Sequence, residues 1–141
     1  MITNVIADDN VYLQSFEPNY IKEKNLDITK LRILLNELGF NPVAAGTQYI
    51  IDALEYFFNN NITEIKNLKQ AYMIPAEKHN KPIKQVQWDV ESAIEIMNKY
   101  APKKLLQEIF FWYDSYKRMT PRFFILTMNS YLQQNFKEYQ K

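Results

Sequence analysis

Apolar side chains recur at helical spacing along most of this chain, and this pattern constrains the fold more than any other feature. Between Asp27 and Gly39 they stand three and four residues apart, as on one face of an α-helix. Similar spacing returns in later segments. We therefore predict an all-α domain of about six helices, over residues 28–38, 47–58, 62–79, 82–100, 103–116 and 122–139. The buried faces are expected to carry Ile28, Leu31, Leu34, Leu35 and Leu38; Ile50, Ile51, Leu54, Phe57 and Phe58; Ile62, Ile65, Leu68, Tyr72 and Ala76; and Val86, Val90, Ala93, Ile94 and Met97.

Residues that start or stop helices stand between these segments. Asp27 suits an N-cap, and Gly39 stands where a left-handed C-cap belongs. The asparagines at 59–61 tolerate turn geometry and are expected to end the second helix. Thr120 followed by Pro121 is a cap followed by a first-turn proline. Pro75 is expected to kink or split the third helix.

Composition narrows the class of protein. The chain has 141 residues, enough for one domain with a real core. It contains only 2 glycines, which argues against a loop-rich β fold and against a glycine loop that cradles phosphate. It has no cysteine, so disulfides, thiolate metal sites and cysteine nucleophiles are excluded. With no secretory signal and no apolar run long enough to span a bilayer, we expect a cytoplasmic protein that does not contact a membrane.

The residues before the first apolar stripe show a different pattern from the rest of the chain. Residues 2–7 are expected to form a short buried strand that ends at the acid pair Asp8 and Asp9. Pro18 and Asn19 then break any helix before the first apolar stripe.

Enzyme chemistry finds little support in the sequence. The only histidine, His79, stands near Lys78 and Lys81 and lacks a metal-ligand partner at helical spacing. We interpret it as a solvated loop histidine. Nucleophile-elbow and phosphate-loop motifs are absent as well. We predict that the chain is not an enzyme and carries neither a metal nor a cofactor.

Residues 66–98 have the form of a helix-turn-helix. One helix ends near His79, the polar turn Asn80-Lys81-Pro82 follows, and an amphipathic helix begins. In such a pair the second helix lies in the major groove of DNA, and its first residues reach base edges. Lys78, Lys81 and Lys84 cluster at the turn, where phosphates would run. Helix pairs of this kind also occur in proteins that bind no DNA, so the pattern leaves both readings open.

An aromatic run follows the second helix of this pair. On a helix such a run covers more than one face, so some rings should pack in the core while others form a dimer or partner contact. A stacking platform for bases is the less favoured alternative. The run consists of Phe110, Phe111, Trp112, Tyr113 and Tyr116.

Four segments in collinear order resemble the C-terminal effector domain of the sporulation master response regulator (stage zero, protein A). They are NLDITKLRILLNELGFNPVAAGTQYIIDAL at 25–54, AYMIPAEKHN at 71–80, VESAIEI at 90–96 and TPRFFILTMNSYL at 120–132. The resemblance implies a DNA-binding transcriptional regulator with a helix-turn-helix. It also implies a contact with the RNA polymerase sigma subunit through the region after the recognition helix.

Residues 6–21 resemble the first strand and helix of a receiver domain from the same regulator. The resemblance makes Asp8 and Asp9 the counterparts of the acids that bind magnesium there. No later strand for a phosphoacceptor aspartate precedes the effector helices. We therefore expect a receiver-like stub over residues 1–24, joined to a helical effector domain over residues 25–141.

The recognition helix departs from the family pattern. The family places arginines along its exposed face, and the corresponding positions here are Gln85, Trp88 and Glu91, with Asp89 and Glu95 nearby. Carboxylates repel phosphates, so family-like DNA recognition is weakened. Glutamine side chains can still read adenine, and Trp88 can pack on a thymine methyl group.

Our leading prediction is a regulator that binds double-stranded DNA and works without phosphorylation, with a homodimer as a further expectation. The alternative is a protein-interaction module of the same fold that has lost DNA binding and modulates a full-length regulator. The expected DNA-binding residues are Lys78, Lys81, Lys84, Gln85, Gln87 and Trp88, with Lys103 and Lys104 as backbone contacts.

Overall fold

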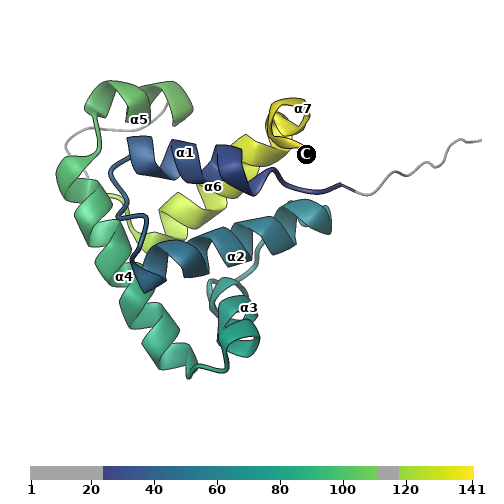
Figure 1. Cartoon of the computed structure of the whole chain (residues 1–141), viewed down its shortest axis with the longest axis vertical. Coiled ribbons are helices and arrows are strands. Elements are labelled where there is room, and N and C mark those ends of the chain that lie inside the picture. Colours follow the sequence, from purple (N-terminus) through teal and green to yellow (C-terminus); the bar gives the residue numbers. More distant parts are fainter. Residues whose placement is uncertain (1–23, 111–117) are drawn as a thin grey trace, which may run out of the picture.

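The computed structural model describes residues 24–110 and 118–141, and its regular elements are helices throughout these ranges (Figure 1). This confirms the all-α prediction. The described residues form seven helices: α1 (Ile28–Glu37), α2 (Ala45–Asn59), α3 (Lys69–His79), α4 (Ile83–Tyr100), α5 (Lys103–Ile109), α6 (Pro121–Gln134) and the single turn α7 (Phe136–Tyr139).

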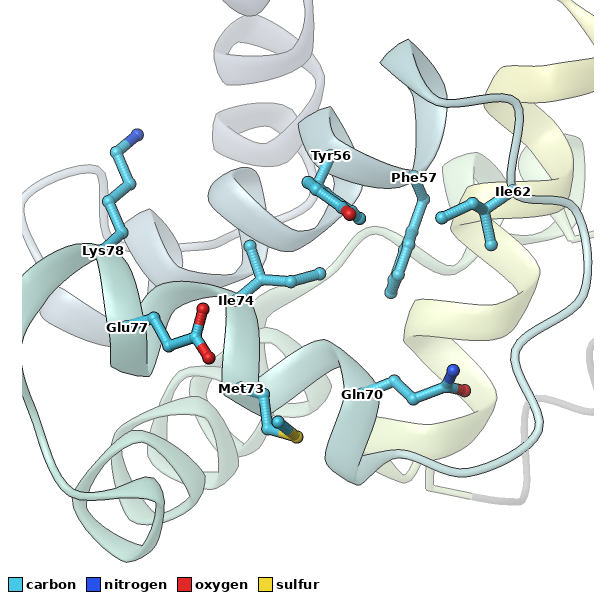
Figure 2. A pocket seen from close by; sticks show the side chains of 8 residues that line it. All are labelled: Tyr56, Phe57, Ile62, Gln70, Met73, Ile74, Glu77 and Lys78. Atoms are coloured by element: carbon cyan, nitrogen blue, oxygen red, sulfur yellow. The ribbon is translucent and has the colours of Figure 1, made fainter.

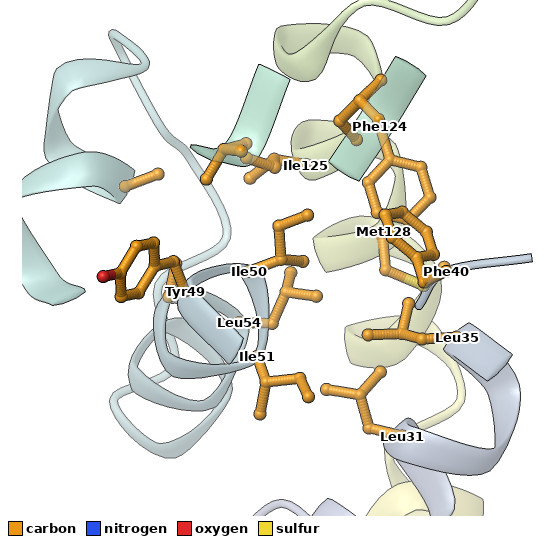
Figure 3. Close-up of a cluster of buried hydrophobic side chains, with 14 of the residues drawn as sticks. Leu31, Leu35, Phe40, Tyr49, Ile50, Ile51, Leu54, Phe124, Ile125 and Met128 are labelled. Carbon is orange, nitrogen blue, oxygen red and sulfur yellow. The ribbon is translucent and has the colours of Figure 1, made fainter. Parts of the chain in front are cut away.

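Helix α2 lies at the centre of the domain, in contact with α1, α3, α4 and α6. Its apolar stripe is buried, and Ile50 and Leu54 have no exposed surface. Figure 3 shows this stripe facing Leu31 and Leu35 of α1 and Met128 of α6. The buried faces predicted for α1, α2 and α4 are confirmed, apart from a half-buried Ile28.

Helix α2 approaches α4 closely because Gly46 has no side chain. A Cβ atom at Gly46 would lie 2.0 Å from the backbone oxygen of Asp89 and 2.9 Å from the Cβ of Ala93. Real Cβ atoms do not come this near to a backbone oxygen. The glycine therefore sets the spacing between the central helix and α4.

The predicted capping residues act as expected. Asp27 accepts a hydrogen bond from the Lys30 backbone N–H at 3.3 Å, and Thr120 accepts one from Phe123 at 3.1 Å. Gly39 has φ +97°, the left-handed conformation that ends α1. Asn61, with φ 55°, turns the chain after α2.

Helix α3 begins at Lys69, whereas the sequence predicted a helix from residue 62. Residues 62–68 are not helical. Side chains there satisfy backbone groups that a helix would otherwise pair. Gln70 Oε1 accepts from the Lys66 N–H at 3.0 Å, and Asn67 Oδ1 accepts from the Lys69 N–H at 2.8 Å. Ile65 is buried as predicted, although it does not lie in a helix. Pro75 lies inside α3 and does not split it.

Two further helices are shorter than predicted. The helix expected over 103–116 ends at Ile109, because Phe110 takes φ −117° and ψ 75°. The helix expected over 122–139 breaks at Asn135, whose side-chain amide donates to the Tyr131 carbonyl at 2.8 Å. The Asn135 N–H still donates to the same carbonyl at 3.1 Å, and the helix ends there because Asn135 takes φ −113° and ψ 35°.

The last described residues pair with the first ones. The Asp27 N–H donates to the Tyr139 carbonyl at 2.8 Å, and the Lys141 N–H donates to the Asn25 carbonyl at 2.7 Å. The strand predicted over residues 2–7, with Asp8 and Asp9, lies outside the described residues. Among the described helices, none is both long and apolar enough to cross a membrane.

Candidate nucleic-acid interface

Helices α3 and α4 are joined by the short turn that the sequence predicted, at the lower end of Figure 1. Asn80 takes the left-handed conformation (φ 54°, ψ 53°), and the Lys81 N–H closes α3 on the Ala76 carbonyl at 2.9 Å. Pro82 is extended and directly precedes the first turn of α4. The arrangement is that of a helix-turn-helix.

Helix α4 has one buried face and one exposed face. Its buried face packs on α2, so its position relative to the core is fixed. On the other face, Trp88 stays 56% exposed, and a shallow depression forms around it with Glu91, Ser92 and Glu95. Lys84 and Gln85 are exposed in the first turns. This exposed face is the part of the helix that a major groove could receive.

Carboxylates engage the two glutamines that were expected to read bases. The Gln85 amide nitrogen donates to Asp89 at 3.1 Å, and the Gln87 amide nitrogen donates to Glu91 at 3.1 Å. Reading adenine needs both the amide nitrogen and the amide oxygen. Each glutamine would have to leave its carboxylate to make that contact.

The lysines expected to contact DNA lie at both ends of α4. Lys81 and Lys84 are exposed at the turn and at the start of α4. Lys103 and Lys104 are exposed at the start of α5, beyond the other end of α4. An 18-residue helix is about 27 Å long. The two lysine pairs therefore stand at opposite ends of the candidate interface.

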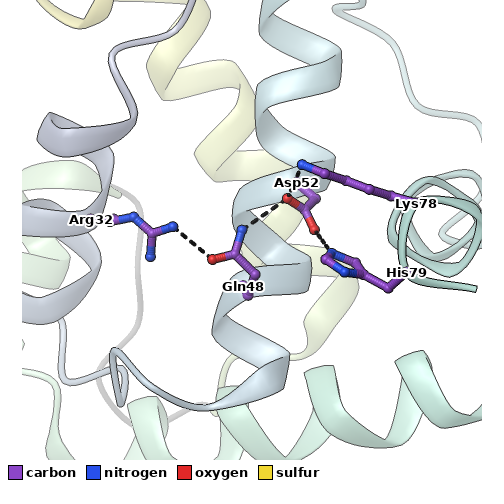
Figure 4. A network of polar contacts seen from close by, with 5 residues as sticks. All are labelled: Arg32, Gln48, Asp52, Lys78 and His79. Atoms are coloured by element: carbon purple, nitrogen blue, oxygen red, sulfur yellow. Dashed lines mark hydrogen bonds and ion pairs between the residues drawn. The ribbon is translucent and has the colours of Figure 1, made fainter. Parts of the chain in front are cut away.

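Lys78 and His79 belong to a polar network centred on the buried carboxylate of Asp52 (Figure 4). The Asp52 carboxylate, whose side chain is 1% exposed, accepts from Lys78 Nζ at 3.1 Å and lies 2.7 Å from His79 Nε2. The reading of His79 as a solvated loop residue is therefore wrong. His79 lies in the last turn of α3 and holds that turn against α2.

Two further side chains extend this network. The Gln48 amide nitrogen donates to Asp52 at 3.0 Å, and the Gln48 amide oxygen accepts from Arg32 of α1 at 2.7 Å. Sequence analysis missed these residues. Asp52 could have indicated the network, because it is an acid in the middle of the apolar stripe of α2. A buried carboxylate needs polar partners.

A second cleft flanks the exposed face of α4, with a volume of about 540 Å³. Two cations that sequence analysis missed, Lys69 of α3 and Arg122 of α6, line it beside Gln87 and Glu91. Tyr72 forms part of its wall, and burial, reinforced by the Glu91 charge, raises the pKa of Tyr72 to about 12. The hydroxyl is therefore neutral at physiological pH.

The expected aromatic surface needs a correction at Phe110. This side chain has no exposed surface, and its ring packs on Phe124 of α6 at 6.0 Å between centroids. Phe110 belongs to the core because the chain bends there and turns the ring inward. The other members of the run, Phe111, Trp112, Tyr113 and Tyr116, lie outside the described residues.

Over the described ranges, no three histidine or acidic side chains come together as metal ligands would. Comparison with known proteins points instead to a regulatory family. The family model for the C-terminal region of the sporulation initiation factor Spo0A matches residues 31–132, well over half of the chain. The matched range contains α3, the turn and α4 completely. No curated protein matches the chain.

Proposed function

Because the chain belongs to the family of C-terminal domains of the sporulation initiation factor Spo0A, a DNA-binding effector family and not an enzyme family, we propose that it binds double-stranded DNA and regulates transcription. Binding places the first half of α4 in the major groove. Lys81 and Lys84 contact phosphates, and Trp88 meets base edges. Such a protein acts on the chromosome, so we expect a cytoplasmic location.

One observation carries this proposal: α4 is packed on the core along one face and free along the other, directly after a helix-turn-helix turn. The exposed carboxylates on that face lower affinity for every sequence, because they repel phosphates. Lys69 and Arg122 lie beside the same face and partly offset this repulsion. We therefore propose weak binding that depends strongly on salt.

We further propose that binding needs no phosphorylation. This rests on the resemblance of residues 6–21 to the start of a receiver, which makes Asp8 and Asp9 counterparts of magnesium-binding acids, and on a sequence that predicts no further strand for a phosphoacceptor before α1. Treatment with a small phosphodonor should leave the protein unlabelled and its DNA affinity unchanged. Stoichiometric labelling that disappears in Asp9→Asn would contradict this.

A second candidate function is a protein-interaction module that modulates a full-length regulator. It is favoured by the exposed indole of Trp88, since aromatic side chains are enriched at protein interfaces. The neighbouring Glu91 and Glu95 repel phosphates and so favour a partner other than DNA. The RNA polymerase sigma subunit and a second copy of the chain are the partners that we would test first.

Titration of fluorescent duplexes with the unaltered protein at two salt concentrations separates the two functions. DNA binding predicts saturable binding at low salt that weakens as salt rises, and a further loss in Lys84→Ala. The interaction module predicts no binding to any duplex, together with loss of partner binding in Trp88→Ala. Lys137→Ala, at an exposed lysine of α7, is the matched control for lost charge.

A further inference from the structure

An open apolar groove lies between the last turns of α2 and the outer side of α3 (Figure 2). Its volume is about 620 Å³, and its walls come from α2, the segment after it and α3. Tyr56 and Met73 line it with 47% and 40% of their surface exposed. These are large apolar side chains outside the candidate DNA interface, and the proposed function does not use them.

The chain enters the described structure beside this groove. Lys24 Nζ lies 4.8 Å from the centre of the Phe58 ring, and the Leu26 N–H donates to Asn59 Oδ1 at 2.8 Å. Phe58 and Asn59 directly follow Tyr56 and Phe57, which line the groove. Because an extended chain covers about 3.3 Å per residue, the 23 residues before Lys24 can span about 75 Å, more than the length of α2, which is about 22 Å.

The segment before Lys24 is acidic and rich in apolar residues, a composition that suits binding to an apolar groove. Residues 1–23 carry four acids and one lysine. The groove lining itself carries one acid, Glu77, and one base, Lys78. Lys66 adds a second base beside the groove residue Gln70, whose side-chain oxygen accepts from the Lys66 N–H at 3.0 Å. The apolar residues of the segment are Met1, Ile2, Val5, Ile6, Ala7, Val11, Tyr12, Leu13, Phe16, Tyr20 and Ile21.

We propose that residues 1–23 dock in this groove of the same molecule, with apolar side chains against Tyr56 and Met73. The tether gives the segment an effective concentration on the order of millimolar, so weak contacts suffice to hold it. Docking covers the outer side of α3 and leaves the exposed face of α4 free. A result against docking would therefore leave the proposed DNA binding untouched, and a result against DNA binding would leave docking untouched.

A spin label tests the proposal in the full chain. The sequence has no cysteine, so Ser15→Cys places one label on the segment without competing sites. The methyl group of Met73, labelled with carbon-13, reports from inside the groove. We expect the Met73 signal to lose intensity when the label is paramagnetic and to recover when the label is reduced.

Two groove variants separate docking from mere proximity. Tyr56→Glu adds a charge that repels the acidic segment and should restore the Met73 signal. Val43→Glu is the matched control, because Val43 is 88% exposed and does not line the groove. It should leave the loss of signal unchanged.

Three results would overturn the proposal. One is an equal Met73 signal in both states of the label. Another is a loss that persists in Tyr56→Glu. The last is a loss that arises only between differently labelled molecules in a mixed sample, which would assign the groove to a second copy.

Discussion

Asp52 of α2 and His79 of α3 lie 2.7 Å apart, carboxylate oxygen to ring nitrogen, and join the central helix to the helix-turn-helix. His79 directly precedes Asn80, the left-handed residue that begins the turn. Its ring also packs beside Tyr49, 5.4 Å away between centroids. The direction in which the chain enters α4 therefore depends on a polar contact to the buried carboxylate of Asp52.

Removing this anchor should destabilise the domain. We expect Asp52→Ala to lower the free energy of unfolding by about 1–3 kcal/mol, because Lys78, His79 and Gln48 lose a shared acceptor. Glu95→Ala breaks the exposed pair with Arg118 and should cost less than about 1 kcal/mol. Urea unfolding measures both. Equal losses in the two variants would show that the network around Asp52 stabilises the fold no more than the exposed ion pair does.

The close approach of α2 and α4 gives a second prediction. Gly46→Ala should destabilise by about 2 kcal/mol or more, because the added methyl group meets the Asp89 backbone, which cannot move without shifting α4. Ser130→Ala, at an exposed position of α6, should be neutral or slightly stabilising. Thermal unfolding of both variants tests this. A Gly46→Ala protein of unchanged stability would place α4 farther from α2 than described.

Stability should fall at high pH partly through Tyr72. Its pKa is raised from 10.0 to about 12 in the folded protein, so the unfolded chain loses this proton first. The contribution of Tyr72 is fully present below about pH 10 and is lost as pH rises towards about 12. Unfolding midpoints at about pH 9 and about pH 11 should differ less in Tyr72→Phe than in the unaltered protein. An unchanged difference would contradict the burial of this hydroxyl; Tyr100→Phe, at a 66% exposed tyrosine, is the control.

The helices and their buried faces were predictable because apolar spacing and capping residues are local signals. Asp27 and Thr120 cap helices as expected. The predicted apolar residues of α4 face the core: Val86, Val90, Ala93, Ile94 and Met97. The predicted start of α3 was wrong because side chains there compete with the backbone. Gln70 and Asn67 pair with backbone N–H groups and delay α3, and no apolar pattern reveals such bonds.

The candidate interface was predictable only in part. The turn and the exposed face of α4 were predictable from local sequence. The side chains that other helices place beside α4 were not. Lys69 and Arg122 reach the flank of α4 from helices distant in the sequence. Lys78 turned out to pair with Asp52, which lies 26 residues earlier. Long-range pairings of this kind depend on how α2, α3 and α6 pack, and periodicity does not determine that.

The most direct test of DNA binding is the salt dependence of duplex affinity after charge reversal at Glu91. This residue is exposed on α4 and lines the cleft with Lys69 and Arg122. Fluorescent duplexes of unrelated sequence are titrated at two salt concentrations with the unaltered protein, Glu91→Arg and Glu37→Arg. The last variant makes the same charge change on exposed Glu37 of α1.

We expect Glu91→Arg to bind every duplex more tightly and to steepen the salt dependence by about one counterion, while Glu37→Arg changes little. An affinity gain of equal size in both arginine variants would mean that only net charge matters and that α4 does not face the duplex. Absence of binding by the unaltered protein to any duplex, even at low salt, would contradict the proposed function itself.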